Sequence, residues 1–250
     1  MIIWITGASS GLGRELARQY AKAGHKVCVS ARSVNTLNEL ADACQNMPGR
    51  IYTFPLDVTD TNETSACLKQ ISELVGRPNL SVLNAGTHTE NSVKGFDRDT
   101  YQRLMDVNYM GVVNCLQAII PVYAKQREGE IAVVASVAGY RGLPNASAYA
   151  ASKAALISLC ESLQPELAAV DVSLRLINPG FVRTPLTDLN NFHMPFLMEV
   201  EDAATRIVKG LEGDRFEITF PRRFTWLLKL LRILPYAVYL KLTRKLLRDA

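Results

Sequence analysis

Tyr149 and Lys153 stand four residues apart in a segment with a helical pattern. Side chains at this spacing lie on one face of a helix. A free tyrosine has a pKa of about 10, and a neighbouring ammonium lowers the pKa of a phenol because it stabilises the phenolate. The pair can therefore exchange a proton with a substrate as a general acid or base. The alternative is a surface contact without chemical function.

Other polar residues follow predicted strands. Ser136 comes directly after the apolar run Glu130–Ala135, and its hydroxyl can hydrogen-bond a reacting oxygen. The triplet Asn84-Ala85-Gly86 follows the run Leu80–Leu83. Asn108 lies inside a long helical segment among apolar residues, where a buried amide satisfied by the backbone is the alternative to a catalytic role.

Two further strand ends carry similar signals. Asp57 and Val58 follow the third predicted strand, and Asp57 either holds an adenine edge or only begins the next helix. Pro179 and Gly180 follow the sixth strand. A rigid turn there can contact a nicotinamide ring, with Val182 and Thr184 close behind.

A glycine-rich turn follows the first predicted strand and has the spacing GxxxGxG rather than GxGxxG. Glycines allow a tight turn and let backbone N–H groups approach a pyrophosphate. The helix that follows points its positive end at the same anion. A purely structural turn is the alternative. The candidate phosphate-binding residues are Gly7, Ser9, Ser10, Gly11, Leu12 and Gly13.

The second strand ends in Ala31, Arg32 and Ser33. An acidic residue at this position would favour NAD by binding the ribose 2′-hydroxyl. A guanidinium instead suits a 2′-phosphate through charge-assisted hydrogen bonds. The sequence therefore favours NADP(H), with NAD(H) as the alternative cofactor if Arg32 is only a solvated residue at a strand end.

The elements that must position these residues alternate between short apolar runs and longer helical segments. This order predicts a parallel sheet covered on both faces, an α/β doubly wound, Rossmann-like fold of about seven strands. Ligands bind such a sheet beyond the carboxyl ends of its strands. We expect one catalytic domain over residues 1–220, a basic amphipathic helical extension over 221–250, and a single continuous helix over about 99–126.

Taken together, these motifs resemble the short-chain dehydrogenase/reductase family over about Ile2–Phe220. The resemblance implies a catalytic tetrad of Asn108, Ser136, Tyr149 and Lys153 and hydride transfer between a nicotinamide and a carbonyl carbon. It implies that the tyrosine exchanges the proton, the serine positions the substrate oxygen and the asparagine holds a water. It further implies that the lysine lowers the tyrosine pKa and binds the nicotinamide ribose, that no metal takes part, and that the chain forms a homo-oligomer.

Composition narrows the remaining possibilities. The net charge is +4, but residues 221–250 hold eight basic residues and one acidic residue, so the other 220 residues carry −3. Nucleic-acid binding by the body therefore has no support. Five widely spaced cysteines and the lack of a signal-peptide pattern favour a reducing, cytoplasmic location and buried thiols.

Two segments give information on the substrate and on the surface that the tail contacts. An apolar stretch over about Pro185–Glu199 suggests a hydrophobic, lipid-like carbonyl or alcohol substrate, although any pocket lid is apolar. The tail contains apolar residues, tryptophan and cations, which fits a membrane surface and equally a face packed on the body or on a second subunit. A catalytically silent nucleotide-binding regulator and a membrane-surface scaffold are the competing functions.

The apolar residues of the stretch Pro185–Glu199 are Leu186, Leu189, Phe192, Met194, Phe196, Leu197 and Met198. Further candidates for the pocket wall are Tyr140, Arg141 and Leu143.

Overall fold

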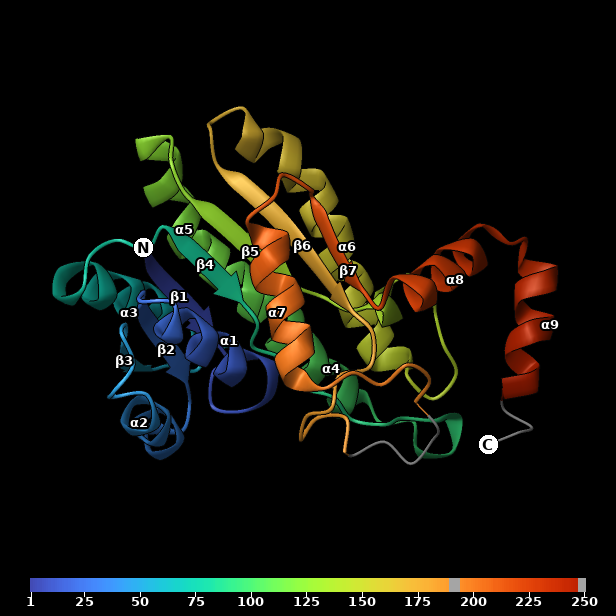
Figure 1. Cartoon of the computed structure of the whole chain (residues 1–250). Coiled ribbons are helices and arrows are strands. Elements are labelled where there is room, and N and C mark those ends of the chain that lie inside the picture. The colour runs from blue at the N-terminus through green and yellow to red at the C-terminus, as the bar shows by residue number, and fades with distance from the viewer. Residues whose placement is uncertain (189–193, 247–250) are drawn as a thin grey trace.

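Seven strands and the helices between them make up the body of the molecule, a computed structural model that describes residues 1–188 and 194–246 (Figure 1). The strands are β1 (Ile2–Thr6), β2 (Lys26–Ala31), β3 (Arg50–Pro55), β4 (Leu80–Leu83), β5 (Glu130–Val134), β6 (Ser173–Pro179) and β7 (Glu217–Phe220). The helices of the body are α1 (Gly11–Lys22), α2 (Val34–Ala43), α3 (Thr61–Leu74), α4 (Arg98–Met105), α5 (Gly111–Gln126), α6 (Ser147–Ala168) and α7 (Val200–Leu211). Two helices form the tail, α8 (Arg222–Ile233) and α9 (Tyr236–Leu246).

All seven strands are parallel and lie in the order β3-β2-β1-β4-β5-β6-β7. The strand order reverses between β1 and β4, so the loops that follow these two strands leave in opposite directions. The predicted doubly wound fold is confirmed. Such a reversal opens a crevice at the carboxyl edge of the sheet, where ligands bind.

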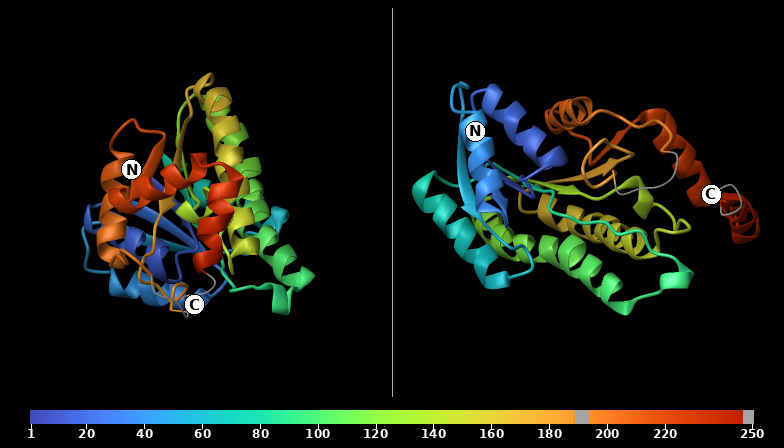
Figure 2. Two further views of the ribbon diagram at one scale, coloured as in Figure 1. Left: turned by 90° about the vertical axis from the view of Figure 1, so that its right-hand side faces the viewer. Right: turned by 90° about the horizontal axis from the view of Figure 1, so that it is seen from below.

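Helices cover both faces of the sheet, as the two turned views in Figure 2 show. One core lies between the sheet and α3, α5 and α6, and includes Trp4, Leu116 and Leu156. The other lies between the sheet and α1, α2 and α7, and includes Leu16 and Ile207. Because strands buried on both faces need apolar side chains on both, they appear in the sequence as continuous rather than alternating apolar runs. The five cysteines are buried, as expected.

The helical segment before β5 differs from the sequence prediction of one continuous α-helix. Residues Asp106–Met110 form a π-helical turn between α4 and α5. Asn108 lies in this turn with its side chain fully buried. Such turns are local widenings of a helix that frequently occur at functional sites. A π-helical turn adds one residue to the helix and hardly changes the spacing of its apolar residues. Hydrophobic periodicity therefore did not predict this turn.

The same segment, Arg98–Gln126, is long and apolar enough to cross a membrane by length and composition. Its inner side, however, is part of the core, where Leu104, Val112, Leu116 and Ile119 are buried. These apolar residues face the sheet side of the molecule, so their hydropathy is explained by packing in the body.

The tail leaves the body after β7. Figure 1 shows α8 extending beyond the edge strand and α9 turning away from it at a corner formed by Leu234 and Pro235. Pro235 has no backbone N–H and fits this break between the two helices. The helical extension expected from the amphipathic pattern is therefore present, and Leu247 and Arg248 lie outside the described residues.

Candidate active site

The glycine-rich turn after β1 is fixed by the loop after β4. The side-chain amide of Asn84 donates hydrogen bonds to the carbonyl oxygens of Thr6 and Gly7, both at 3.1 Å. The Thr6 hydroxyl accepts from the backbone N–H groups of Asn84 and Ala85. Gly7 has φ +68°, and a Cβ there would lie 2.7 Å from the Ala85 Cα, so glycine is required. Asn84 therefore holds the turn in shape.

The N-terminus of α1 opens from this turn. Within the described residues, no side chain accepts a hydrogen bond from its first turn, and that turn holds no acidic residue. Backbone N–H groups that lack a capping partner are suited to an anion, and the helix dipole adds to the attraction. A pyrophosphate fits this donor set. Thr184, after β6, lies against the same turn, since its Cγ2 is 3.1 Å from the position of a Cβ on Gly11.

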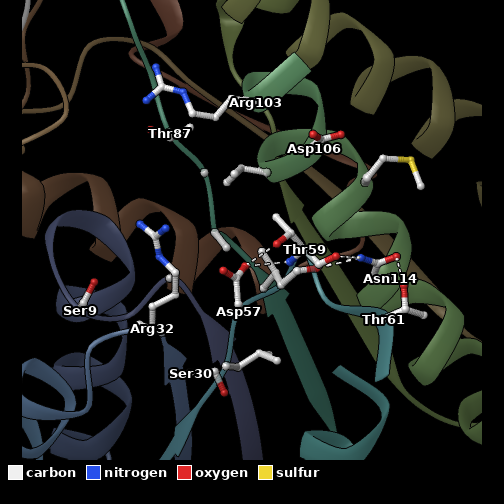
Figure 3. A pocket seen from close by; sticks show the side chains of 18 of the residues that line it. Ser9, Ser30, Arg32, Asp57, Thr59, Thr61, Thr87, Arg103, Asp106 and Asn114 are labelled. Carbon is white, nitrogen blue, oxygen red and sulfur yellow. Dashed lines mark hydrogen bonds between the residues drawn. The ribbon is translucent and has the colours of Figure 1, made fainter. Parts of the chain in front are cut away.

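A cavity of about 1010 Å³ extends from the turn along the carboxyl edge of the sheet (Figure 3). This volume suits a dinucleotide-sized ligand. The predicted cofactor residues that line it are Gly7, Ser9, Ala31, Arg32, Ser33, Asp57, Val58, Ala85 and Gly86. Further lining residues, not singled out in the sequence, are Ser30, Leu56, Thr59, Thr61, Thr87, Asp99, Gln102, Arg103, Asp106, Val107, Met110 and Asn114.

Arg32 and Asp57 point into this cavity from neighbouring strands (Figure 3). The carboxylate of Asp57 accepts hydrogen bonds from the backbone N–H and the hydroxyl of Thr59 at 3.0 and 2.8 Å. These bonds, together with the positive charge of Arg32, hold the pKa of Asp57 below its usual value. Asp57 is therefore an ionised acceptor, and Arg32 is exposed at the mouth of the cavity.

Ser33, which was predicted as a cofactor residue and lines the cavity, also has a structural role. It is the N-cap of α2, and its side chain accepts a hydrogen bond from the backbone N–H of Thr36 at 3.4 Å. A serine that precedes a helix commonly satisfies such an N–H group. At this end of the cavity, the exposed guanidinium of Arg32 carries the positive charge.

Tyr149 and Lys153 lie near the start of α6 and face the same side. The Lys153 amine lies 5.8 Å from the centre of the Tyr149 ring. It also donates a hydrogen bond of 2.9 Å to the carbonyl oxygen of Val134, at the end of β5. Its neighbours include Gly86, since a Cβ placed there would lie 3.5 Å from the amine. The loops after β4 and β5 and the helix α6 therefore meet at this lysine.

The two ionisable groups are shifted by burial. Lys153 is 4% exposed, and burial lowers its pKa to about 8. Burial also raises the pKa of Tyr149, which the hydrogen bond with the Ser136 hydroxyl partly opposes. The sequence predicted that Lys153 lowers the pKa of Tyr149. In the structure the pKa of Tyr149 is instead raised. The reason is that removal of water disfavours a phenolate and an ammonium alike.

Asn108 is tied to α6 and to the loop after β4. Its amide oxygen accepts from the backbone N–H of Thr87 at 2.7 Å, and its amide nitrogen donates to the carbonyl oxygen of Thr87 at 3.0 Å. The nitrogen also donates to the hydroxyl of Ser152 at 3.0 Å, and Ser152 in turn donates to the carbonyl oxygen of Tyr149 at 2.8 Å. Asn108 is thus a buried, satisfied amide that also couples the π-helical turn to the tyrosine.

Some residues near the site were not predicted. The ring of His88 packs edge-on against Tyr149, with the ring centres 4.8 Å apart. Ser152 was passed over because it stands between Tyr149 and Lys153 on a helix in which many small residues occur. Its polar character within a buried helical face was the one available signal.

Two candidates for the pocket wall contact β7 and the tail instead. The hydroxyl of Tyr140 donates a hydrogen bond to the Glu217 carboxylate at 2.5 Å. Arg141 donates to backbone carbonyl oxygens at the end of α8. The local sequence carries no information about these partners, which lie far along the chain.

The loop after β6 runs from the sheet edge to α7. The N–H of Gly180 donates to the carbonyl oxygen of Phe220 at 2.7 Å, and Val182 forms a single parallel bridge with Met198. Phe196 in this loop is exposed. Leu189 and Phe192, expected in the apolar lid, lie outside the described residues.

The comparisons with known proteins agree with this arrangement. The short chain dehydrogenase family model matches residues 1–193, and this chain belongs to that family. It is accordingly an oxidoreductase of the dehydrogenase/reductase class. An uncharacterised oxidoreductase of Myxococcus xanthus is 35% identical over 242 residues, which are 97% of this chain and 96% of that protein. The 3-oxoacyl-[acyl-carrier-protein] reductase FabG of Thermotoga maritima is 32% identical over 184 residues, 74% of this chain and 75% of its own.

Solved structures show the same fold. A short chain dehydrogenase/reductase of Burkholderia phymatum in complex with NAD superposes with a TM-score of 0.84, at 24% identity over 92% of each chain. A short-chain dehydrogenase of Sphingobium yanoikuyae in complex with NADPH has a TM-score of 0.80, at 24% identity over 88% of this chain and 87% of its own. At 24% identity, the similarity to these two structures supports the fold alone.

Proposed function

We propose that this chain is an NADP(H)-dependent oxidoreductase that interconverts a carbonyl and an alcohol on an apolar substrate. One observation carries the proposal: Tyr149, Ser136 and Lys153 converge at the carboxyl edge of the sheet, beside the cavity that begins at the glycine-rich turn. A phenol with a hydroxyl partner and a buried amine can move a proton to or from a substrate oxygen.

The proposed roles follow from the contacts. A bound nicotinamide would supply or accept the hydride. Tyr149 donates the proton to the carbonyl oxygen in reduction and removes it in oxidation, while the Ser136 hydroxyl holds that oxygen. Lys153 keeps positive charge near the phenol and binds the ribose. Asn108 fixes the start of α6 and holds a water.

The proposed cofactor contacts use the two ends of the cavity. The backbone of Gly7, Ser9, Ser10, Gly11, Leu12 and Gly13 would bind the pyrophosphate, as the uncapped start of α1 suggests. Asp57, Val58, Ala31, Arg32 and Ser33 would surround the adenosine, and Asn84, Ala85, Gly86, Pro179, Gly180, Val182 and Thr184 would line the nicotinamide end. The exposed guanidinium of Arg32 at the mouth favours NADP(H), because a 2′-phosphate offers it a charge-assisted partner.

The substrate class is inferred from the loop after β6 and the start of α8. The rings of Phe181 and Phe196 each lie 5.8 Å from that of Phe224. An apolar wall of this kind suits a hydrophobic carbonyl or alcohol. Since such a substrate partitions into lipid, we propose that the enzyme works in the cytoplasm close to a membrane.

We also propose that the chain forms a homo-oligomer through α5 and α6. On the outer side of α6, Ala151, Ala154 and Ser158 are exposed. These small residues would let a second helix approach closely. Light scattering of the eluted protein measures the mass directly, and a monomer at micromolar concentration would contradict this part of the proposal.

Replacement of Tyr149 by phenylalanine tests the function. The variant should lose turnover by about three orders of magnitude or more, yet bind NADPH as the wild type does in a fluorescence titration. Tyr52→Phe, on the distant strand β3, is the control and should keep full activity. Wild-type turnover in Tyr149→Phe would overturn the chemical assignment. NADPH binding without turnover of any carbonyl by the wild type would identify a silent nucleotide-binding protein.

A further inference from the structure

We propose that α8 and α9 form a docking surface for a membrane that contains anionic lipid. The surface consists of an outward apolar stripe on α8 and a cationic face on α9. The members of the apolar stripe are Trp226, Leu227, Leu230 and Ile233, and those of the cationic face are Lys241, Arg244 and Lys245.

Contacts with the body fix which side of α8 faces outward. Phe224 is buried against Phe181 and Phe196, and the buried Thr225 hydroxyl lies 3.2 Å from that of Thr219 on β7. One helical turn further on, the Lys229 amine pairs with the carboxylate of Glu217. The side of α8 that bears Phe224 and Thr225 is therefore held against the sheet edge.

The corner between α8 and α9 is also held by contacts with the body. The Arg141 guanidinium donates to the carbonyl oxygens of Leu231 and Leu234, the latter at 2.8 Å, and so satisfies the end of α8. It also lies 3.8 Å from the centre of the Tyr239 ring. The hydroxyl of Tyr239 donates to the carbonyl oxygen of Gly142 at 2.5 Å. The tail is thus attached to the loop that follows Ser136.

These contacts leave a second apolar side of α8 facing outward. A surface helix normally turns its apolar residues inward and its cations to water. Here Lys229 is directed to a carboxylate of the body, while Trp226, Leu230 and Ile233 are 71%, 56% and 76% exposed. Leu227 is also exposed, and the spacing of the four residues places them on one side of the helix. A contiguous exposed apolar patch of this kind marks an interaction site.

The charges identify the partner as anionic. On α9, Lys241, Arg244 and Lys245 are exposed, and apolar residues flank them. Arg222 and Arg223 add two more exposed cations at the start of α8. The whole segment 221–250 carries +7 and the remaining residues −3. Juxtamembrane cations are attracted by anionic headgroups, and the negative body favours the orientation with the tail toward them.

A second copy of the chain fits this surface less well. Two such tails packed face to face would bring the cationic faces together, and like charges at close range cost free energy. A bilayer instead offers an acyl region for the apolar stripe and headgroups for the cations, with tryptophan at the boundary. A membrane location would also suit the proposed function. This argument rests on that function, because it uses the contact between Phe196, in the loop after β6 proposed to face the substrate, and the start of α8.

Vesicle flotation and tryptophan emission test the docking in the full-length protein. The chain has two tryptophans, and Trp4 is 0% exposed, so a change in emission on lipid addition reports Trp226. With vesicles of phosphatidylcholine and phosphatidylglycerol, the protein should float and its emission should shift to the blue. With phosphatidylcholine alone, or at high salt, binding should fall by about tenfold or more.

Two variants separate the contributions. Leu230→Ser with Ile233→Ser, and Lys241→Gln with Lys245→Gln, should each lower the bound fraction by about tenfold. Leu74→Ser, at an equally exposed position on α3, and Lys69→Gln on the same helix are the matched controls and should bind as the wild type does. Reduction of a water-soluble carbonyl, measured in parallel, should be unchanged in all variants. Failure of that reaction in the wild type concerns the proposed function, whereas flotation concerns only the tail.

The proposal is overturned if the wild type does not float with anionic vesicles. It is also overturned if Trp226 emission is already blue-shifted without lipid and moves to the red on dilution, together with a fall in mass. That result would show that a second copy covers the stripe. Equal binding to neutral and anionic vesicles would contradict the assigned role of the cations.

Discussion

The amine of Lys153 lies 2.9 Å from the carbonyl oxygen of Val134, the last residue of β5. This bond holds the lysine between the sheet edge and Tyr149, where it is nearly inaccessible to water. A buried ammonium with a carbonyl as its hydrogen-bond acceptor lacks a full counter-charge, so burial lowers its pKa to about 8. The position therefore costs stability at neutral pH, which fits the proposed role of Lys153 in the site.

Lys153→Met is expected to change the dependence of stability on pH. The folded pKa of Lys153, about 8, lies below the unfolded value of about 10.4. Between these values the unfolded chain binds more protons, so the free energy of unfolding rises with pH, by up to about 1.4 kcal/mol per pH unit. Methionine has no such group. The free energy of unfolding of the wild type, relative to the variant, should therefore increase by about 2 kcal/mol between pH 7 and 9.5.

Chemical denaturation at several pH values measures this difference. The buried cysteines are present in both proteins, so any effect of their titration on stability cancels in the comparison. Lys69→Met is the control, since that side chain is exposed and should show no pH-dependent difference. A constant gap between the wild type and Lys153→Met would show that Lys153 titrates normally.

The sequence predicted the parts of the fold and site that depend on local spacing. Tyr149 and Lys153 share a helix face because four residues separate them, and the apolar runs indicated the parallel sheet. Asn108 was identified, but its π-helical turn was not, because the apolar spacing hardly changes there. Ser33 was predicted as a cofactor residue, and its additional role as the N-cap of α2 was not predicted. The direction of the apolar stripe of α8 depends on Glu217, Arg141 and other distant partners, which periodicity cannot supply.

Arg32→Ala should separate the two nicotinamide cofactors. Arg32 is exposed at the mouth of the cavity with Asp57 nearby. A charge-assisted hydrogen bond contributes about 1.5 to 3 kcal/mol, so the Kd for NADPH should rise by about 10- to 100-fold while that for NADH changes little. Fluorescence titration with each cofactor gives both constants.

A second arginine provides the control for that titration. Arg127 pairs with Asp171 before the amino end of β5, away from the cavity. Arg127→Ala should leave both cofactor affinities unchanged. If wild type and Arg32→Ala bind NADPH equally, Arg32 is only a solvated residue at a strand end.

Ser152→Ala tests the coupling between Asn108 and α6. Ser152 accepts from the Asn108 amide and donates to the carbonyl oxygen of Tyr149. Its loss leaves part of a buried amide without a partner, at a cost of about 1 to 2 kcal/mol of stability. If Ser152 positions the proton donor, kcat should fall by about tenfold while the KM for NADPH stays unchanged.

Ser65→Ala, at an exposed position of α3, is the matched control and should affect neither quantity. A loss of stability in Ser152→Ala without any change in kcat would assign Ser152 to packing alone.

Glu217→Gln should loosen the attachment of α8, in a manner that depends on pH. Glu217 accepts hydrogen bonds from Tyr140, Asn178 and Lys229. Burial raises its pKa, but these partners together outweigh burial and hold the pKa below its usual value.

A depressed carboxyl pKa contributes stability that is present above the unfolded value of about 4.3 and is lost as pH falls through the folded value. At pH 7 the variant should therefore be less stable by about 2 kcal/mol, and the gap should narrow as the pH falls below about 4.3. Denaturation followed by tryptophan emission measures this gap, and Glu73→Gln, at an exposed position of α3, should show none. A gap that is equally large at pH 7 and at pH 3 would mean that the charge of Glu217 does not hold the tail.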